Sequence, residues 1–140
     1  MITLDEVHDF GSRWFNAASG GSAADQAAFF LDPHSRIYVL WNGTTFDFEE
    51  HRKLHAQWIN ELHRFGPFTL TPLSASPERV RATGTVYWQA EFAGRPAPNM
   101  IKAVIGEDWI LERTASGGLK YVLYMVTSYH TLQDSAALDF

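Results

Sequence analysis

The stretches Val80–Phe92 (VRATGTVYWQAEF) and Met100–Arg113 (MIKAVIGEDWILER) alternate between two faces, as strands do when they bury one side. Two further runs, Phe68–Ser74 and Leu119–Tyr129, have the same period of two. Short breaks rich in Gly, Pro and Ser separate the four runs. Because connections of that length join antiparallel neighbours, these runs predict a mostly antiparallel sheet.

The part of the chain that precedes these runs has mostly helical periodicity. Helices are predicted from Thr3 to the Ser19-Gly20-Gly21 break, over residues 23–31, and over residues 48–62, where Gly66-Pro67 would end the third. A short strand is predicted at residues 36–41. Helices followed by strands predict an α+β fold, in which a curved sheet wraps around the N-terminal helices within one domain of residues 1–140. Capping boxes are expected where each helix starts, at Thr3 with Glu6, Ser22 with Asp25, and Asp47 with Glu50.

Composition narrows the class of protein. The chain has 140 residues, of which 46% are hydrophobic and 14% aromatic, which is enough for a sizeable core and suits a cavity with flat aromatic walls. The net charge is −5 and basic residues form no stripe, so nucleic acid is not an expected partner. There is no cysteine, no signal peptide and no apolar run of membrane-spanning length, so we expect a soluble cytoplasmic protein.

The predicted helix 48–62 places two histidines on its apolar face. At about 100° per residue, His51 and His55 lie on the side of Leu54 and Trp58. A polar ring on a buried face needs a hydrogen-bond partner or borders a wet cavity, so we expect a pocket. The expected ligand-binding residues are mostly aromatic: Trp14, Tyr38, Trp41, Trp58, Trp88, Arg113 and Tyr124.

Three roles are open for these histidines. Their spacing is that of helical metal ligands, but Arg52 stands where zinc proteases carry a glutamate, so we expect no metal and no cofactor. Core histidines bonded to backbone or water are an alternative. The third role is a pocket acid or base, which suits imidazole because its pKa is near neutrality. Two other histidines, His8 and His63, are expected on solvated helix surfaces.

Two adjacent acids, Glu107 and Asp108, are further candidates for the site. The strand phase of residues 100–113 sends Glu107 and Arg113 inward and Asp108 outward. A β-bulge at Gly106 would reverse this phase, so both acids stay candidates. An inward carboxylate beside His51 or His55 would orient the ring. The structural alternative is an ion pair between Glu107 and Arg113.

The layout resembles the nuclear transport factor 2-like superfamily, in particular its SnoaL-like group. The resemblance rests on the paired N-terminal helices, the exit Leu31-Asp32-Pro33 into residues 36–41, the helix at 48–62, and Glu107-Asp108-Trp109 before the Gly117-Gly118 hairpin. It implies a cone-shaped cavity between sheet and helices, and frequent dimers through the outer face of the sheet. Such proteins include isomerases, dehydratases, epoxide hydrolases, polyketide cyclases and non-catalytic binding proteins.

Ketosteroid isomerases of this superfamily carry a tyrosine in the first helix, an aspartate base after the first strand and a second acid in a later strand. Here the corresponding positions hold Trp14, then Trp41 or Asn42, and Asp108. Only the second acid matches, which argues against that particular constellation.

Three functions from different classes remain. The first is a metal-free acid–base lyase, isomerase or hydrolase, polyketide-cyclase-like, in which His51 and His55 act on an apolar or aromatic substrate and Asp108 or Glu107 orients them. The second is a protein that binds a hydrophobic ligand without chemistry. The third is a dimerising scaffold, because residues 119–129 are apolar on both faces. For all three we expect a homodimer through the sheet face, and no membrane partner.

Overall fold

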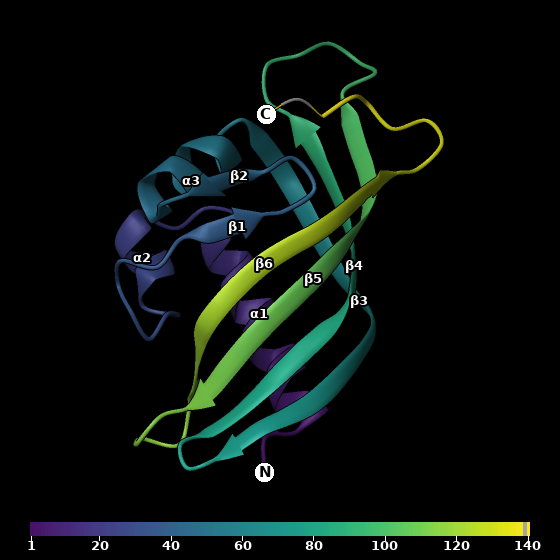
Figure 1. Cartoon of the computed structure of the whole chain (residues 1–140). Helices are drawn as coiled ribbons and strands as arrows, with labels where there is room; N and C mark the ends of the chain where they lie inside the picture. The colour runs from purple at the N-terminus through teal and green to yellow at the C-terminus, as the bar shows by residue number, and fades with distance from the viewer. Residues whose placement is uncertain (139) are drawn as a thin grey trace.

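The computed structural model describes residues 1–138 and 140, and in this part of the chain the helices pack against one six-stranded sheet (Figure 1). The strand order is β2-β1-β6-β5-β4-β3, and every neighbouring pair is antiparallel except β1 with β6. The predicted α+β fold is therefore confirmed. In chain order the elements are α1 (Leu4–Ala18), α2 (Ala23–Ala27), β1 (Ile37–Val39), β2 (Thr44–Phe46), α3 (Phe48–His55), β3 (Trp58–Ala75), β4 (Glu78–Phe92), β5 (Met100–Arg113) and β6 (Leu119–Thr131).

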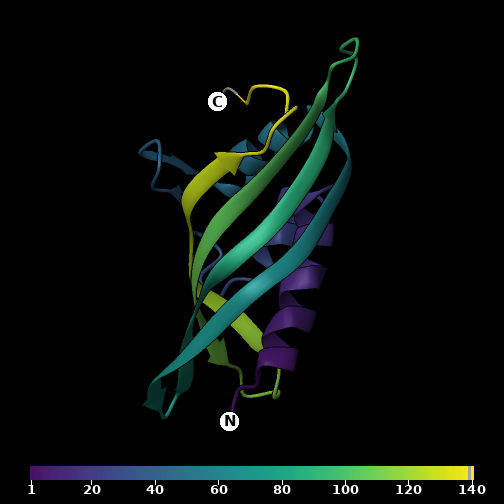
Figure 2. The same cartoon turned by 90° about the vertical axis from the view of Figure 1, so that its right-hand side faces the viewer.

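The four long strands twist and curve around α1, which lies along their inner face (Figures 1 and 2). The short elements α2, α3, β1 and β2 gather beside the C-terminal end of α1 (Figure 1). The interior therefore has two ends. At one end α1 packs directly on the sheet, and at the other end α3 packs beside α1, while β1 and β2 extend the sheet next to β6.

Helix α1 approaches the sheet closely because of one glycine. A Cβ atom added at Gly11 would lie 2.7 Å from Cζ of Phe65 and 3.1 Å from the ring of Trp109. Both distances are shorter than ordinary carbon–carbon contacts, so only glycine fits this crossing. On either side of it Val7, Phe10 and Trp14 are buried, and this end of the interior is filled.

All three predicted capping boxes are present. The side chains of Thr3, Ser22 and Asp47 each accept a hydrogen bond from the backbone three residues later, and the acids at those later positions bond back. Each cap satisfies backbone donors that the first helical turn leaves free, which stabilises a helix by about 1 kcal/mol. These boxes fix where the chain enters each helix.

The predicted helix over residues 48–62 is wrong in its second half. Helix α3 ends at His55, and β3 begins at Trp58 and runs through Gly66-Pro67 to Ala75. The second predicted helix is also shorter, since α2 ends at Ala27. Beyond α2 the chain turns, and Phe30 forms an isolated bridge with Tyr121 of β6.

Bulges in β3 explain why its start looks helical in sequence. The register with β4 shifts between Ile59 and Leu62, and Asn60 there has a φ of 53°, a left-handed conformation that asparagine tolerates. Trp58 and Glu61 consequently both contribute to the interior, three residues apart as on a helix. A second shift, between Phe65 and Phe68, accommodates Gly66-Pro67 inside the strand.

Strand β5 keeps its phase, and the bulges next to it lie in β6. The pairing of β5 with β4 runs without a shift, whereas its pairing with β6 skips Val122 and Thr127. The proposed re-aiming of β5 at Gly106 is therefore wrong. Each bulge in β6 adds one residue and so shifts the alternation of its side chains by one position. Tyr121, Tyr124 and Tyr129 can therefore all face the interior.

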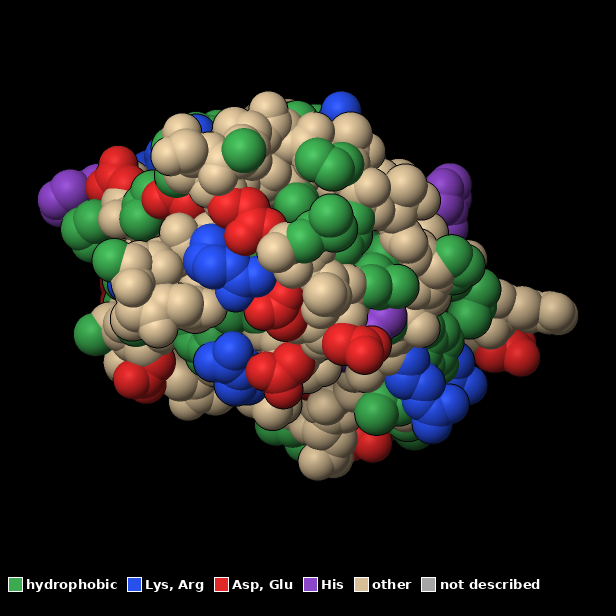
Figure 3. All heavy atoms as spheres, turned by 90° about the horizontal axis from the view of Figure 1, so that it is seen from below, with side chains coloured by type: hydrophobic (Ala, Val, Ile, Leu, Met, Phe, Trp, Pro, Cys, Tyr) green, Lys and Arg blue, Asp and Glu red, His purple; other side chains and the backbone are tan. Residues whose placement is uncertain are grey.

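The outer surface carries mixed charge. On the face drawn in Figure 3, acidic and basic side chains lie next to one another. Of the helices in the described residues, none is long and apolar enough to span a membrane.

Candidate active site

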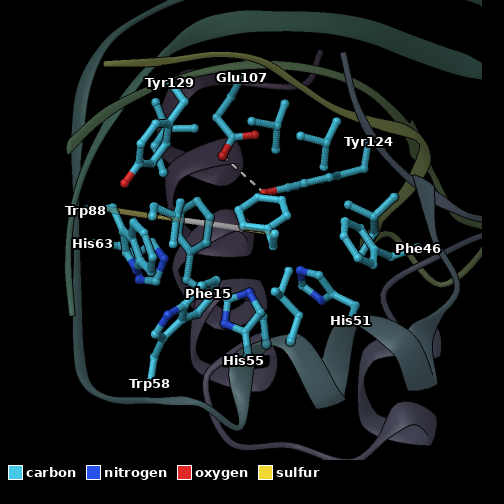
Figure 4. Close-up of a pocket in the computed structure, with 18 of the residues that line it drawn as sticks. Phe15, Phe46, His51, His55, Trp58, His63, Trp88, Glu107, Tyr124 and Tyr129 are labelled. Carbon is cyan, nitrogen blue, oxygen red and sulfur yellow. Dashed lines mark hydrogen bonds between the residues drawn. The ribbon is translucent and has the colours of Figure 1, made fainter. Parts of the chain in front are cut away.

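A pocket of about 80 Å³ lies between the upper part of the sheet, the C-terminal half of α1 and α3 (Figure 4). Its walls are mainly aromatic and aliphatic. Trp41 and Phe140, each 39% exposed, lie where the pocket opens to solvent. The lining residues are Trp14, Phe15, Ala18, Ile37, Val39, Trp41, Phe46, His51, Leu54, His55, Trp58, His63, Trp88, Ile105, Glu107, Tyr124, Val126, Tyr129, Leu138 and Phe140.

His51 projects from α3 into this pocket and is held as a neutral ring. Its Nδ1 atom lies 2.7 Å from the amide Oε1 of Gln26, which is fully buried on α2. Because an amide oxygen only accepts, Nδ1 donates and the lone pair is on Nε2. Burial, together with the charge of His55, holds the pKa of His51 well below its usual value. Trp14 stacks parallel to the ring at 5.9 Å.

His55 is oriented by a carboxylate. Its Nδ1 atom donates to Oε2 of Glu61 at 3.0 Å, while Oε1 of Glu61 accepts from Nε1 of Trp88, also at 3.0 Å. The Glu61 side chain is 2% exposed. Burial alone would raise the pKa of Glu61. The opposing effects are larger and lower this pKa; they come from the hydrogen bond and charge of His55, the charge of His63 and the hydrogen bond from Trp88. His55 therefore presents the lone pair of Nε2, backed by a carboxylate.

The two imidazoles lie side by side, with ring centroids 4.3 Å apart. Two positive charges at this distance repel each other strongly in a low-dielectric site, and this repulsion adds to burial in lowering the pKa of His51.

Glu107 lies on the opposite wall of the pocket from the histidines (Figure 4). It is 4% exposed, and it accepts hydrogen bonds from Nε1 of Trp109 at 3.1 Å and from the hydroxyl of Tyr124 at 3.2 Å. Burial raises the pKa of Glu107 to about 8, although the two hydrogen bonds lower it. At neutral pH this carboxyl group is mostly protonated and can donate.

Two expected charged site residues lie outside the pocket. Asp108 faces the outer side of β5 and pairs with Arg81, whose Nε donates to Oδ1 at 2.9 Å. Arg113 pairs with Glu6 and Glu78, each at 2.9 Å. The alternative ion pair between Glu107 and Arg113 is therefore wrong, because Arg113 lies further along the strand, at its end.

The expected aromatic walls are largely brought together. Trp14, Trp41, Trp58, Trp88 and Tyr124 line the pocket. Tyr38 does not, because Ile37 and Val39 on either side of it point inward and strand alternation turns Tyr38 away.

Three polar residues of the site were not predicted. Gln26, which bonds to His51, lies in the second predicted helix and was given no role, and Glu61, which bonds to His55, was expected on the polar face of the predicted helix 48–62. His63 was expected on a solvated surface, but it lines the pocket and stacks on Phe15 with ring centroids 4.2 Å apart. Burial lowers the pKa of His63 to about 4, although the charge of Glu61 raises it. Recognising residues 58–65 as a strand would have placed Glu61 and His63 inside.

Two polar atoms in the pocket wall are buried without a hydrogen-bond partner. They are Nε1 of Trp58 and the hydroxyl of Tyr129. Buried polar groups normally find a partner, so these atoms are available to a ligand or to water. Among the described residues, no group of three His, Asp or Glu side chains is arranged to hold a metal ion.

Comparison with known proteins identifies the fold. No family model and no curated protein matches the sequence. Among solved structures, ActVI-ORFA from Streptomyces coelicolor is 20% identical with a TM-score of 0.62, over 88% of this chain and 94% of that one. A hexachlorocyclohexane dehydrochlorinase, LinA-type3 from Novosphingobium barchaimii, is 17% identical with a TM-score of 0.66, over 96% and 93%. An NTF2-like protein from Cytophaga hutchinsonii is 10% identical with a TM-score of 0.65, over 91% and 99%.

These similarities show that the chain has the nuclear transport factor 2-like fold, as the resemblance in sequence implied. At such low identity they carry the fold and not the chemistry. The chemistry has to be argued from the pocket.

Proposed function

We propose that the chain is an acid–base enzyme of the lyase, isomerase or hydrolase kind that acts on an apolar or aromatic small molecule. His55 is the general base and Glu107 the general acid. One observation carries the proposal: a carboxylate-backed imidazole and a carboxyl group with a pKa of about 8 face each other across one apolar pocket. A carboxyl group that stays protonated at neutral pH suits a general acid, and an imidazole oriented by a carboxylate suits a general base.

An elimination uses both groups at once. The Nε2 atom of His55 takes a proton from a substrate carbon, and the electron pair of that C–H bond forms a new double bond. The bond to the leaving group on the neighbouring carbon breaks, and the leaving group receives the proton of Glu107. In an isomerisation or a polyketide-cyclase-like ring closure, the electron pair moves onto a carbonyl oxygen instead, and Glu107 donates to that oxygen.

The other polar groups of the pocket orient or stabilise His55 and Glu107. Glu61 fixes the His55 ring and stabilises the imidazolium that forms. Tyr124 and Trp109 direct their hydrogens at the Glu107 carboxyl oxygens, so they stabilise the carboxylate that remains after proton transfer. His51 supplies a second lone pair beside His55. The aromatic walls exclude water, which strengthens each of these interactions.

The names of structural neighbours are consistent with this chemistry. One neighbour is called a hexachlorocyclohexane dehydrochlorinase, which is an elimination on an apolar ring. The pocket described above could hold such a ring only if its rim moves, because engineered cavities that take up benzene are roughly 150 Å³. Trp41 and Phe140 are the most exposed of the lining residues, and outward movement of their rings would break their contact with each other and those with Tyr129, Phe46 and Trp58.

The test is turnover of a panel of apolar cyclic halides, alcohols and ketones, hexachlorocyclohexane included. For any substrate that the wild type converts, His55→Ala should lower kcat/KM by about 100- to 10,000-fold, with the circular dichroism spectrum unchanged. His34→Ala, at an exposed histidine, is the matched control and should keep full activity. Unchanged turnover in His55→Ala would eliminate the proposed base.

The alternative is a binding protein that uses the same pocket without chemistry. The unpartnered Trp58 and Tyr129 atoms favour it, because they need only a ligand to bond to. NMR titration of the histidines separates the two functions. A His55 pKa that moves when a ligand binds favours catalysis, whereas ligand binding that leaves every histidine pKa unmoved favours the binding protein.

We also infer a homodimer through the outer face of the sheet. Val104, Ile110, Leu123 and Met125 are half-buried, and they lie on this face of β5 and β6. Apolar side chains that are not fully covered on an outer sheet face are typical of an interface, and here they lie around the Asp108–Arg81 ion pair. A monomeric mass by light scattering at micromolar concentration would contradict it. The cytoplasmic location stays a prediction.

A further inference from the structure

The pocket contains a hydrogen-bond acceptor to which the chemistry above gives no partner, the Nε2 atom of His51. The ring hydrogen is on Nδ1, which donates to Oε1 of Gln26 at 2.7 Å, so Nε2 carries a lone pair. Within residues 1–138 and 140, no group donates to Nε2, and the buried polar side-chain atoms without a partner do not include it. Because His51 lines the pocket (Figure 4), its Nε2 atom is open to the cavity.

The His51 ring is held in one orientation by its neighbours. Trp14 stacks parallel to it, and the ring of His55 lies 4.3 Å away between centroids. Turning the ring over would break the bond to Gln26, which is fully buried, and would leave an amide oxygen without a partner. The lone pair of Nε2 therefore keeps its direction.

The two histidines of α3 differ in the group that holds them. His55 donates to the carboxylate of Glu61, whereas His51 donates to an uncharged amide. A carboxylate stabilises the imidazolium, and an amide does so far less. Burial and the charge of His55 also keep the pKa of His51 well below its usual value. His51 is thus a neutral acceptor beside the proposed base.

An open acceptor in an apolar pocket constrains what the pocket can hold. Water can donate to Nε2 as long as the pocket is empty of ligand. An apolar ring that fills the pocket displaces this water and leaves the lone pair unpaired, which is unfavourable in an apolar environment. A ligand that brings its own donor avoids this cost.

We propose that Nε2 of His51 selects the substrate by accepting a hydrogen bond from a hydroxyl or N–H group on its apolar ring. The proposal rests on the proposed function and names the substrate class of the same site. Because the two imidazoles lie side by side, the donor group would be close to the carbon that loses its proton to His55. A site built to bond such a donor rejects the analogue that lacks it.

Phenol and fluorobenzene test this selection, because they are similar in size and only phenol has a donor. Both rings need the same movement of the pocket rim. NMR titration gives the two dissociation constants, and their ratio, fluorobenzene over phenol, is compared between proteins so that hydration of the free ligands cancels. This ratio should be at least about tenfold larger in the wild type than in His51→Phe, which keeps a ring and removes the acceptor.

His34→Phe is the matched control, since His34 is exposed and does not line the pocket, and it should keep the wild-type ratio. A second measurement needs only the wild type. The ¹⁵N spectrum of the free protein should show His51 with its hydrogen on Nδ1, and phenol, but not fluorobenzene, should shift the Nε2 resonance.

Three results would overturn the proposal: a hydrogen on Nε2 in the free protein, failure of the wild type to bind phenol, or an unchanged ratio in a folded His51→Phe variant. Each would leave the proposed base standing, because His55→Ala kinetics test it separately. Conversely, loss of the ratio in His51→Phe together with full turnover in His55→Ala would keep the acceptor and remove the proposed base.

Discussion

The two faces of β5 place neighbouring carboxyl groups in opposite environments. Glu107, on the inner face, is bonded by the uncharged donors Trp109 and Tyr124, and its pKa rises to about 8. Asp108, on the outer face, pairs with the guanidinium of Arg81. Both are less than 10% exposed, so burial alone does not make a carboxyl group reactive. What differs is whether a cation compensates the charge: Asp108 has Arg81 beside it, whereas Glu107 has no cation as a partner and is able to hold a proton at neutral pH.

The largest expected effect is on catalysis. Glu107→Gln should lower kcat/KM on a converted substrate by about 100- to 10,000-fold, because an amide cannot transfer a proton to the leaving group. Asp108→Asn, the same change one residue along on the other face, should leave kcat/KM within about threefold. Steady-state kinetics of both variants checks this. Equal losses of kcat/KM in the two variants would contradict the assignment of Glu107 to catalysis and of Asp108 to a structural ion pair.

The next effect is on the pH dependence of stability. The pKa of Glu107 is near the ordinary value of 4.5 in the unfolded chain and about 8 in the folded chain. Between these values the folded state binds more protons, so the contribution of Glu107 to stability is full below about 4.5 and is lost as pH rises through about 8. The slope is about 1.4 kcal/mol per pH unit.

Urea unfolding of wild type and Glu107→Gln between pH 5 and 8 measures this contribution as their difference. The wild type should lose stability relative to the variant as pH rises across this range. Asp108→Asn is the comparison variant and should not remove the slope. A wild-type curve parallel to that of Glu107→Gln would contradict the raised pKa.

A smaller effect on stability is expected at Asn60, where a bulge in β3 places Glu61 on the inner face. The left-handed φ of Asn60 lets β3 bulge, and this bulge turns Glu61 toward His55. Asn60→Val should destabilise the protein by about 1–3 kcal/mol, because a β-branched residue is strained there. Asn60→Gly should be tolerated. Thermal unfolding compares the two variants, and equal stabilities would mean that the bulge does not depend on this conformation.

The smallest effect belongs to the outer face. Arg81→Gln should lower stability by less than Asn60→Val does, because the Arg81 side chain is 51% exposed and solvent screens its pair with Asp108. Denaturant unfolding at low and high salt checks this, with the difference between the proteins shrinking at high salt. A loss larger than that in Asn60→Val would show that the outer pair holds the sheet together.

The sequence predicts the fold better than the site, for identifiable reasons. Period-two runs and capping boxes depend on neighbours in the chain, and both are found in the structure. The phase of β5 likewise placed Glu107 inside correctly, because that strand has no bulge against β4. The expected orientation of a histidine by Glu107 or Asp108 failed, since Glu61 makes that contact.

Bulges account for most of what the sequence did not reveal. An inserted residue breaks the alternation on which strand predictions depend, so Trp58 and Glu61 acquired the spacing of a helix face. Gln26 and His51 meet only through the packing of α2 against α3, 25 residues apart in the chain. No local pattern signals such a contact.

The central claim is that Glu107 is a protonated acid at neutral pH and faces His55 across the pocket. The most direct measurement is a ¹³C NMR titration of the Glu107 side-chain carboxyl carbon, assigned by its loss in Glu107→Gln. The account predicts a midpoint of about 8. A midpoint near the ordinary glutamate value would contradict it, because Glu107 would then be an anion with no proton to give.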